Sequence, residues 1–83
     1  MTPEEEDEAR RDPRREDRWE KTTKAGNVLT REVLRLWGQT GTPGRFYTYH
    51  LTYRDQRGRE REVWFTTWED WTRGAKLVKR GRA

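Results

Sequence analysis

Polar and apolar residues alternate along residues 45–54, as expected for a β-strand with one buried face. One set of alternate positions is apolar: Tyr47, Tyr49, Leu51 and Tyr53. The other set is polar: Thr48, His50, Thr52 and Arg54. Because successive side chains of a strand point to opposite faces of a sheet, the first set is predicted to face the core and the second set to face solvent.

The residues after this strand predict a tight turn and a returning strand. The turn is Asp-Gln-Arg-Gly at residues 55–58, typical of a type I turn that ends in a G1 bulge with Gly58 in the left-handed region. This three-residue loop sets two pairs opposite each other: Leu51 with Val63, and Tyr49 with Phe65. A two-residue loop would shift the register by one and turn Trp64 to the core. We prefer the first register because it groups the aliphatic residues.

Residues 28–37 fit two templates. In a helix, one face would carry Leu29, Val33, Leu36 and Trp37. In a strand, one side would carry Leu29, Val33 and Trp37, with Arg31 and Arg35 between them. The Gly- and Pro-containing connection at residues 38–44, with a hairpin directly after it, favours a strand. A third strand would also stabilise the hairpin, since two strands alone are marginally stable.

A helix is predicted after the hairpin, with Thr67 as its N-cap and Asp70 as the acidic partner of a capping box. Its core-facing stripe contains Trp68, Trp71, Ala75 and Val78. Gly74 inside this segment costs about 1 kcal/mol, which predicts an early end or fraying. The predicted fold class is therefore α+β: over residues 25–83, a small three-stranded antiparallel sheet packed against one C-terminal helix.

Residues 1–24 have a different composition and are predicted to form a disordered charged tail. After the first residue, Trp19 is their only large apolar side chain, too little to offset the entropy of ordering the segment. Their nine acidic and seven basic residues give a net charge of −2, whereas residues 25–83 carry twelve basic and six acidic residues, a net charge of +6. The predicted domain is thus basic.

Composition excludes several classes of chemistry. The 83 residues include no cysteine, no serine and a single histidine, His50. Ser-His and Cys-His nucleophilic sites, disulfides and thiolate or His-rich metal sites are therefore excluded. No apolar run is long enough to span a membrane. We expect a non-enzymatic protein of the cytoplasm, without a cofactor.

Arginines and aromatic residues together indicate nucleic-acid binding, with DNA as the expected partner. Arginine binds phosphates and guanine edges, and aromatic side chains stack on bases. The candidate nucleic-acid-binding residues are Arg45, Thr48, His50, Thr52, Arg54, Arg57, Arg59, Arg61 and Trp64, with Arg57, Arg59 and Arg61 gathered at the hairpin tip. The alternative is a small protein-interaction module, such as a phage- or virus-type factor that docks on a host protein, because interfaces favour exposed tryptophan and arginine. Free strand edges would allow a monomer or a weak homodimer.

Two resemblances add to this interpretation. The segment 42–49, the turn with Gly58 and the segment 63–70 resemble the AP2-like and integrase arm-binding domains. That resemblance implies a three-stranded sheet in the DNA major groove, backed by one helix, with contacts from Arg45, Thr48, His50, Thr52, Arg54 and Trp64. The segments 62–68 and 74–81 are similar to the first half of OB-folds that bind single strands. The chain is too short for the two further strands of that barrel.

Overall fold

Five strands and two helices make up the fold. The structure is a computed structural model. It describes the backbone of residues 2–42 and 45–82 and the side chains of residues 2–38 and 50–82. The elements are α1 (Pro3–Arg11), β1 (Arg18–Thr22), β2 (Val28–Thr42), β3 (Arg45–Asp55), β4 (Glu60–Trp64), α2 (Phe65–Arg73) and β5 (Lys76–Lys79). The strands form one antiparallel sheet in the order β4-β3-β2-β1-β5. The predicted α+β class is confirmed, with two strands and one helix more than expected.

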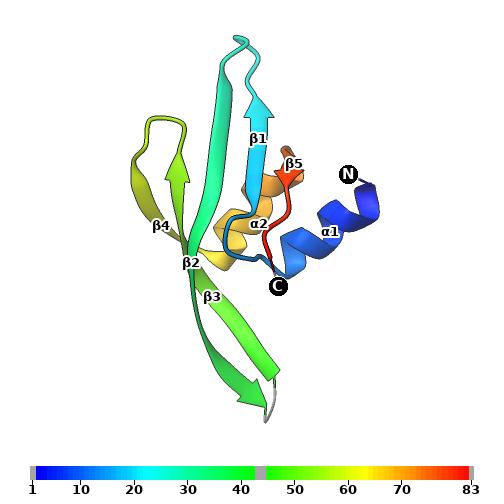
Figure 1. Cartoon of the computed structure of the whole chain (residues 1–83), viewed down its shortest axis with the longest axis vertical. Helices are drawn as coiled ribbons and strands as arrows, with labels where there is room; N and C mark the ends of the chain where they lie inside the picture. The colour runs from blue at the N-terminus through cyan, green and yellow to red at the C-terminus, as the bar shows by residue number, and fades with distance from the viewer. Residues whose placement is uncertain (1, 43–44, 83) are drawn as a thin grey trace.

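The core lies between one face of the sheet and the two helices, which lie on the same side of it (Figure 1). The buried core residues come from both helices, from four of the strands and from the α2–β5 connection: Ala9, Trp19, Val33, Leu51, Tyr53, Trp68, Ala75 and Leu77. The opposite face, here called the outer face, is covered by neither of the two helices in the described part of the chain. The C-terminal part of β2 and the N-terminal part of β3 extend beyond both helices (Figure 1).

The prediction of a disordered tail over residues 1–24 disagrees with the structure, because this segment contains α1 and β1. Trp19 in β1 is fully buried and Ala9 in α1 packs in the same core. The α1 helix has a local basis: Thr2 caps it by accepting a hydrogen bond from Glu5 N, and acidic residues fill its first turn and arginines its last. A single tryptophan buries enough apolar surface to attach a segment that is otherwise polar.

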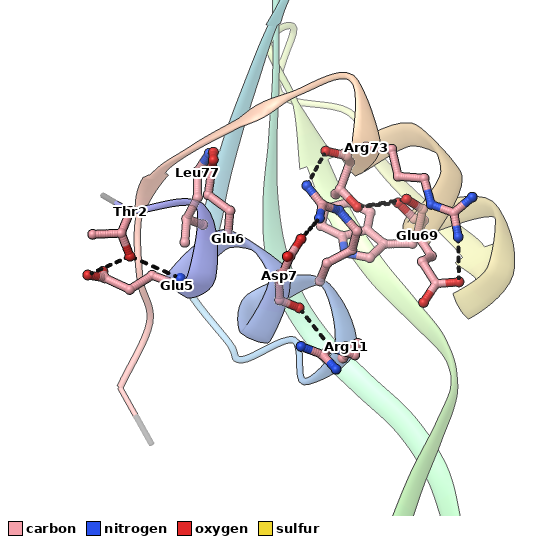
Figure 2. A network of polar contacts seen from close by, with 11 residues as sticks. Thr2, Glu5, Glu6, Asp7, Arg11, Glu69, Arg73 and Leu77 are labelled. Carbon is pink, nitrogen blue, oxygen red and sulfur yellow. Dashed lines mark hydrogen bonds and ion pairs between the residues drawn. The ribbon is translucent and has the colours of Figure 1, made fainter.

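Polar contacts fix α1 to the C-terminal part of the chain (Figure 2). The Glu6 carboxylate accepts a hydrogen bond from Leu77 N at 2.9 Å. The Arg10 guanidinium donates to Thr72 O at 3.1 Å and lies 5.5 Å from the centre of the Trp19 ring. Since the Leu77 N–H belongs to β5, α1 covers this edge strand and supplies one of its backbone partners.

Strand β2 confirms the preference for a strand over residues 28–37, but a bulge changes its faces. Val33 pairs with Tyr53 and Arg35 pairs with Thr52, so the intervening residue of β2 has no counterpart in β3. Each bulge of this kind reverses the alternation of side chains. Trp37 was expected on the same side as Val33; instead, Val33 is buried in the core and Trp37 lies on the outer face.

The hairpin turn has the predicted geometry. Gly58 has a φ of 80°, and its N–H donates to Asp55 O at 3.0 Å. The predicted pairing of Leu51 with Val63 is confirmed. The predicted pairing of Tyr49 with Phe65 is wrong, because β4 ends at Trp64 and Phe65 begins α2.

The Asp55 side chain stabilises this turn, which leads to a pH prediction. Its Oδ1 accepts hydrogen bonds from Arg57 N at 2.9 Å and Arg59 N at 3.0 Å. The bond from Arg59 N is the main cause that holds the pKa of Asp55 below its usual value. Because the folded state has the lower pKa, the charged carboxylate stabilises the fold above the unfolded-state pKa, about 3.9, and this contribution is lost as pH falls through the folded-state pKa.

We therefore expect Asp55→Asn, which keeps an acceptor but has no charge, to be less stable than the wild type at neutral pH. The difference in melting temperature should shrink as pH falls below about 4. Thermal unfolding of both proteins between neutral and acidic pH, followed by circular dichroism, measures this difference. A constant difference down to acidic pH would contradict the role of the charge.

Helix α2 begins and ends earlier than predicted. Its N-cap is Trp64, no side chain caps it, and the predicted Thr67–Asp70 capping box does not form. Gly74 ends the helix, as its low helix propensity suggested. Val78 was expected in the helical core stripe; it lies in β5 and is half exposed, because residues 76–79 pair with β1 instead.

A buried carboxylate joins the segment before β1 to the segment after β5. Asp17 is fully buried. Its Oδ2 accepts hydrogen bonds from Arg80 Nη1 at 2.6 Å and Arg14 N at 2.9 Å, and its Oδ1 accepts one from Gly81 N at 2.6 Å. Any side chain at residue 81 would collide with the backbone, since its Cβ would lie 1.8 Å from Arg15 O. We call these four interacting residues, Arg14, Asp17, Arg80 and Gly81, the Asp17 clasp.

Candidate nucleic-acid interface

Three aromatic side chains lie in a row on the outer face, across three neighbouring strands. His50 in β3 is paired with Trp37 in β2 and with Trp64 in β4. The rings of Trp37 and His50 stack with centroids 5.8 Å apart and planes inclined by 9°. The His50 and Trp64 centroids are also 5.8 Å apart, with the planes tilted by 58°. We call these three residues the aromatic row.

Polar contacts hold two members of the row, and both of its tryptophans are open to solvent. Trp37 Nε1 donates a hydrogen bond to Thr52 Oγ1 at 3.2 Å, and the Glu62 carboxylate contacts the His50 ring. The exposed fraction is 42% for Trp37 and 67% for Trp64. A hollow beside the row is lined by His50, Glu62, Val63 and Trp64. Large aromatic groups that are held rigidly and left uncovered are suited to stacking against a flat ligand.

The structure places four of the sequence-predicted residues on the outer face: His50, Thr52, Arg54 and Trp64. Arg54 forms an ion pair with Glu60 at 3.8 Å on the same face. The side chains of Arg45 and Thr48 lie outside the described residues. Their backbones belong to β3 and pair with Thr42 and Gly38, respectively.

The arginines near the hairpin turn divide between two places. Arg57 and Arg59 are exposed at the turn. Arg61 was expected to join them at the tip, but it pairs with Tyr53 and lines a hollow with Arg31 on the helix side of the sheet. Its position follows from strand alternation, because Arg61 has the same orientation as Val63. Arg61 is thus separated from the aromatic row by the sheet.

A cation also lies between aromatic rings on the helix side. The Arg31 guanidinium lies 4.3 Å from the ring centres of both Tyr53 and Trp71. Burial lowers the pKa of Arg31, and the nearby Arg61 lowers it further. The Lys21 ammonium is 4.6 Å from the Trp71 ring centre, and burial followed by repulsion from Arg31 lowers the pKa of Lys21. These cations cover the exposed side of the core and are remote from the row.

Sequence reasoning missed two residues of the interface, Trp37 and Arg35. Arg35 is exposed and pairs with Thr52, which puts it on the outer face beside the row. Simple alternation from Val33 placed both residues on the core face. The position of the bulge between Val33 and Arg35 depends on pairing with β3, and the sequence of β2 alone carries no clear signal for it.

Other kinds of site receive no support from the part of the chain that the structure describes. No group of three or more His, Cys, Asp or Glu side chains that could hold a metal ion occurs among those residues. None of the helices described is long and apolar enough to cross a membrane. Comparison with known proteins gives no match: no family model fits the chain, and neither a curated protein nor a solved structure is significantly similar to it.

Proposed function

We propose that the protein binds single-stranded nucleic acid, with bases stacked on the aromatic row. The observation that carries this proposal is the exposure of Trp37 and Trp64 on the sheet face that α1 and α2 leave uncovered. Stacking of a base on an aromatic side chain contributes about 1–3 kcal/mol and tolerates any base sequence. Single strands present unstacked bases to such a surface, whereas a duplex buries them.

The charges around the row support a binding mode in which stacking contributes more than phosphate contacts. Arg54 and His50 are each paired with a glutamate, Glu60 and Glu62 respectively. The charge of Arg54 is therefore partly neutralised. Arg35 is exposed beside the row, and Arg57 and Arg59 supply further exposed positive charge at the β3–β4 turn. The glutamates beside Arg54 and His50 thus limit the share of the affinity that phosphate contacts supply at the row.

The proposal predicts that Trp64→Ala weakens binding of a fluorescent oligothymidine by about 5- to 150-fold, the equivalent of one stacked base. Fluorescence anisotropy at two salt concentrations measures the affinity, with a duplex of the same length as comparison. Val28→Ala is the matched control, because Val28 is a half-exposed apolar residue outside the row.

Two results would contradict the proposal. One is the absence of oligothymidine binding even at low salt, where electrostatic attraction is strongest. The other is unchanged affinity of the Trp64→Ala variant, with a circular dichroism spectrum that shows an intact fold. Tighter binding of the duplex than of the single strand would instead favour the groove-binding mode that the AP2-like resemblance implies.

A protein-docking function is the second candidate, and the ion pairs on the outer face favour it. Interfaces commonly combine exposed tryptophan and arginine with paired charges, and Trp64 and Arg54 beside Glu60 and Glu62 fit that pattern. The same oligonucleotide titration distinguishes the two functions. A docking module would show no salt-dependent binding of oligothymidine, whereas a nucleic-acid-binding protein would.

A further inference from the structure

A basic groove begins at one end of the aromatic row. Its first part is lined by Arg15, Arg35, Leu36 and Trp37, so it shares Trp37 with the row. Its second part shares Arg15 and Leu36 with the first and is also lined by Asp12, Pro13, Arg14, Glu16 and Arg82. We call the two parts together the arginine groove. It leads from the outer face towards the segment that precedes β1.

The backbone under this groove is tightly constrained. Asp17 N donates to Arg14 O at 3.1 Å, which closes a turn, and Glu16 N donates to Val33 O at 2.8 Å, which attaches the turn to β2. Glu16 is the only non-glycine residue with a positive φ, 74°, among those described. Such conformations occur where surrounding structure enforces them, and they are frequent at binding sites. The next residue, Asp17, is held by its hydrogen bonds with Arg80 and Gly81.

The charges of the groove differ from those of the row. Among the described side chains, no ion pair involves any of its four arginines: Arg14, Arg15, Arg35 and Arg82. Two acids, Asp12 and Glu16, also line it, and the Asp12 carboxylate is directed to Arg80 at 3.9 Å. The groove thus has an excess of unpaired guanidinium groups, the side chains best suited to bind phosphate oxygens.

We infer that the arginine groove is the phosphate track of the same binding site. This inference rests on the proposed function: a strand whose bases stack on the row passes Trp37, and its next phosphates contact Arg35 and Arg15 before reaching Arg14 and Arg82. The row and the groove then have separate tasks. The row provides stacking that depends little on salt, and the groove provides charge neutralisation that depends strongly on it.

The division of tasks is tested with the double variant Arg15→Gln/Arg35→Gln. The probe is oligothymidine of about ten nucleotides, within the range of site sizes of small single-strand binders. Each lost phosphate contact lowers the slope of log affinity against log salt by about 0.7 for single strands, so the expected decrease is about 1.4. We also expect a weakening of about tenfold at low salt. The Trp64→Ala variant should lose affinity without a change in slope.

The control removes the same charge elsewhere. Arg11→Gln/Arg73→Gln eliminates two exposed arginines on α1 and α2, on the helix side of the sheet, and should leave the slope nearly unchanged. If the groove and control variants lose the same slope, the groove inference is overturned while the proposed function stands. If the wild type does not bind oligothymidine at all, both are overturned. Arg82→Gln provides a second variant, expected to lower the slope by about 0.7.

Discussion

Replacement of Asp17 by alanine is expected to destabilise the protein by about 3–5 kcal/mol, the usual cost when one partner of a buried ion pair is removed. Asp17 is fully buried and accepts hydrogen bonds from Arg14, Arg80 and Gly81. Alanine would leave the Arg80 guanidinium, itself mostly buried, without its closest carboxylate. The two backbone N–H groups would also lose their acceptor, and buried donors without partners are costly.

Chemical denaturation followed by tryptophan fluorescence measures this loss. Asp12→Ala is the matched control, because the Asp12 carboxylate is 71% exposed and lies 3.9 Å from the same Arg80 guanidinium. An exposed pair contributes about 0–1 kcal/mol, so the control should be close to the wild type. Similar losses in the two variants would show that burial of Asp17 does not set the strength of the clasp.

Replacement of Trp19 by alanine is expected to cost about 3–5 kcal/mol, as for other large buried aromatic residues. Trp19 is fully buried, and its ring attaches β1 to the core. It lies beside Leu77, its cross-strand partner in β5. Its indole N–H finds no acceptor among the described residues, so its contribution is apolar packing with the Arg10 guanidinium over the ring. A small domain has a total stability of about 5–15 kcal/mol, so the variant is expected to be partly unfolded at elevated temperature.

Trp64→Ala makes the same change of side chain at a surface position and is the control for Trp19→Ala. With 67% of Trp64 exposed, we expect its removal to change the free energy of unfolding by less than about 1 kcal/mol. Urea-induced unfolding of both variants gives the comparison. If Trp19→Ala were as stable as Trp64→Ala, residues 1–24 would behave as the detached tail that their composition suggests.

Local chemistry explains which parts of the fold could be predicted from the sequence. The turn at Asp55 and Gly58 is specified by residues adjacent to it, and the register that pairs Leu51 with Val63 follows from the turn. Strand β1 could not be predicted in this way. Its place depends on one tryptophan and on pairing with β2 and β5, and neither contact is visible in the average composition of the segment.

The same reasoning applies to the candidate site. A period of two correctly grouped His50, Thr52 and Trp64 on one face, because no bulge interrupts the β3–β4 pairing. Trp37 lies on that face because of the bulge in β2, and the bulge is evident only from the pairing of β2 with β3. Residue 15 belongs to the segment predicted to be a disordered tail. The sequence therefore did not predict that Arg15 lies beside Arg35 in the groove.

The Asp17 clasp also has a consequence for cooperativity. The hydrogen bonds from Arg80 and Gly81 to Asp17 span 63 and 64 positions of the chain, respectively. The segment around Asp17 therefore cannot separate from the segment around Gly81 without losing them. Release of Gly81 removes a hydrogen-bond donor from the buried Asp17 carboxylate, which belongs to the same turn as Arg14. We therefore expect the segment around Arg14 and the segment around Gly81 to open together, as one cooperative unit.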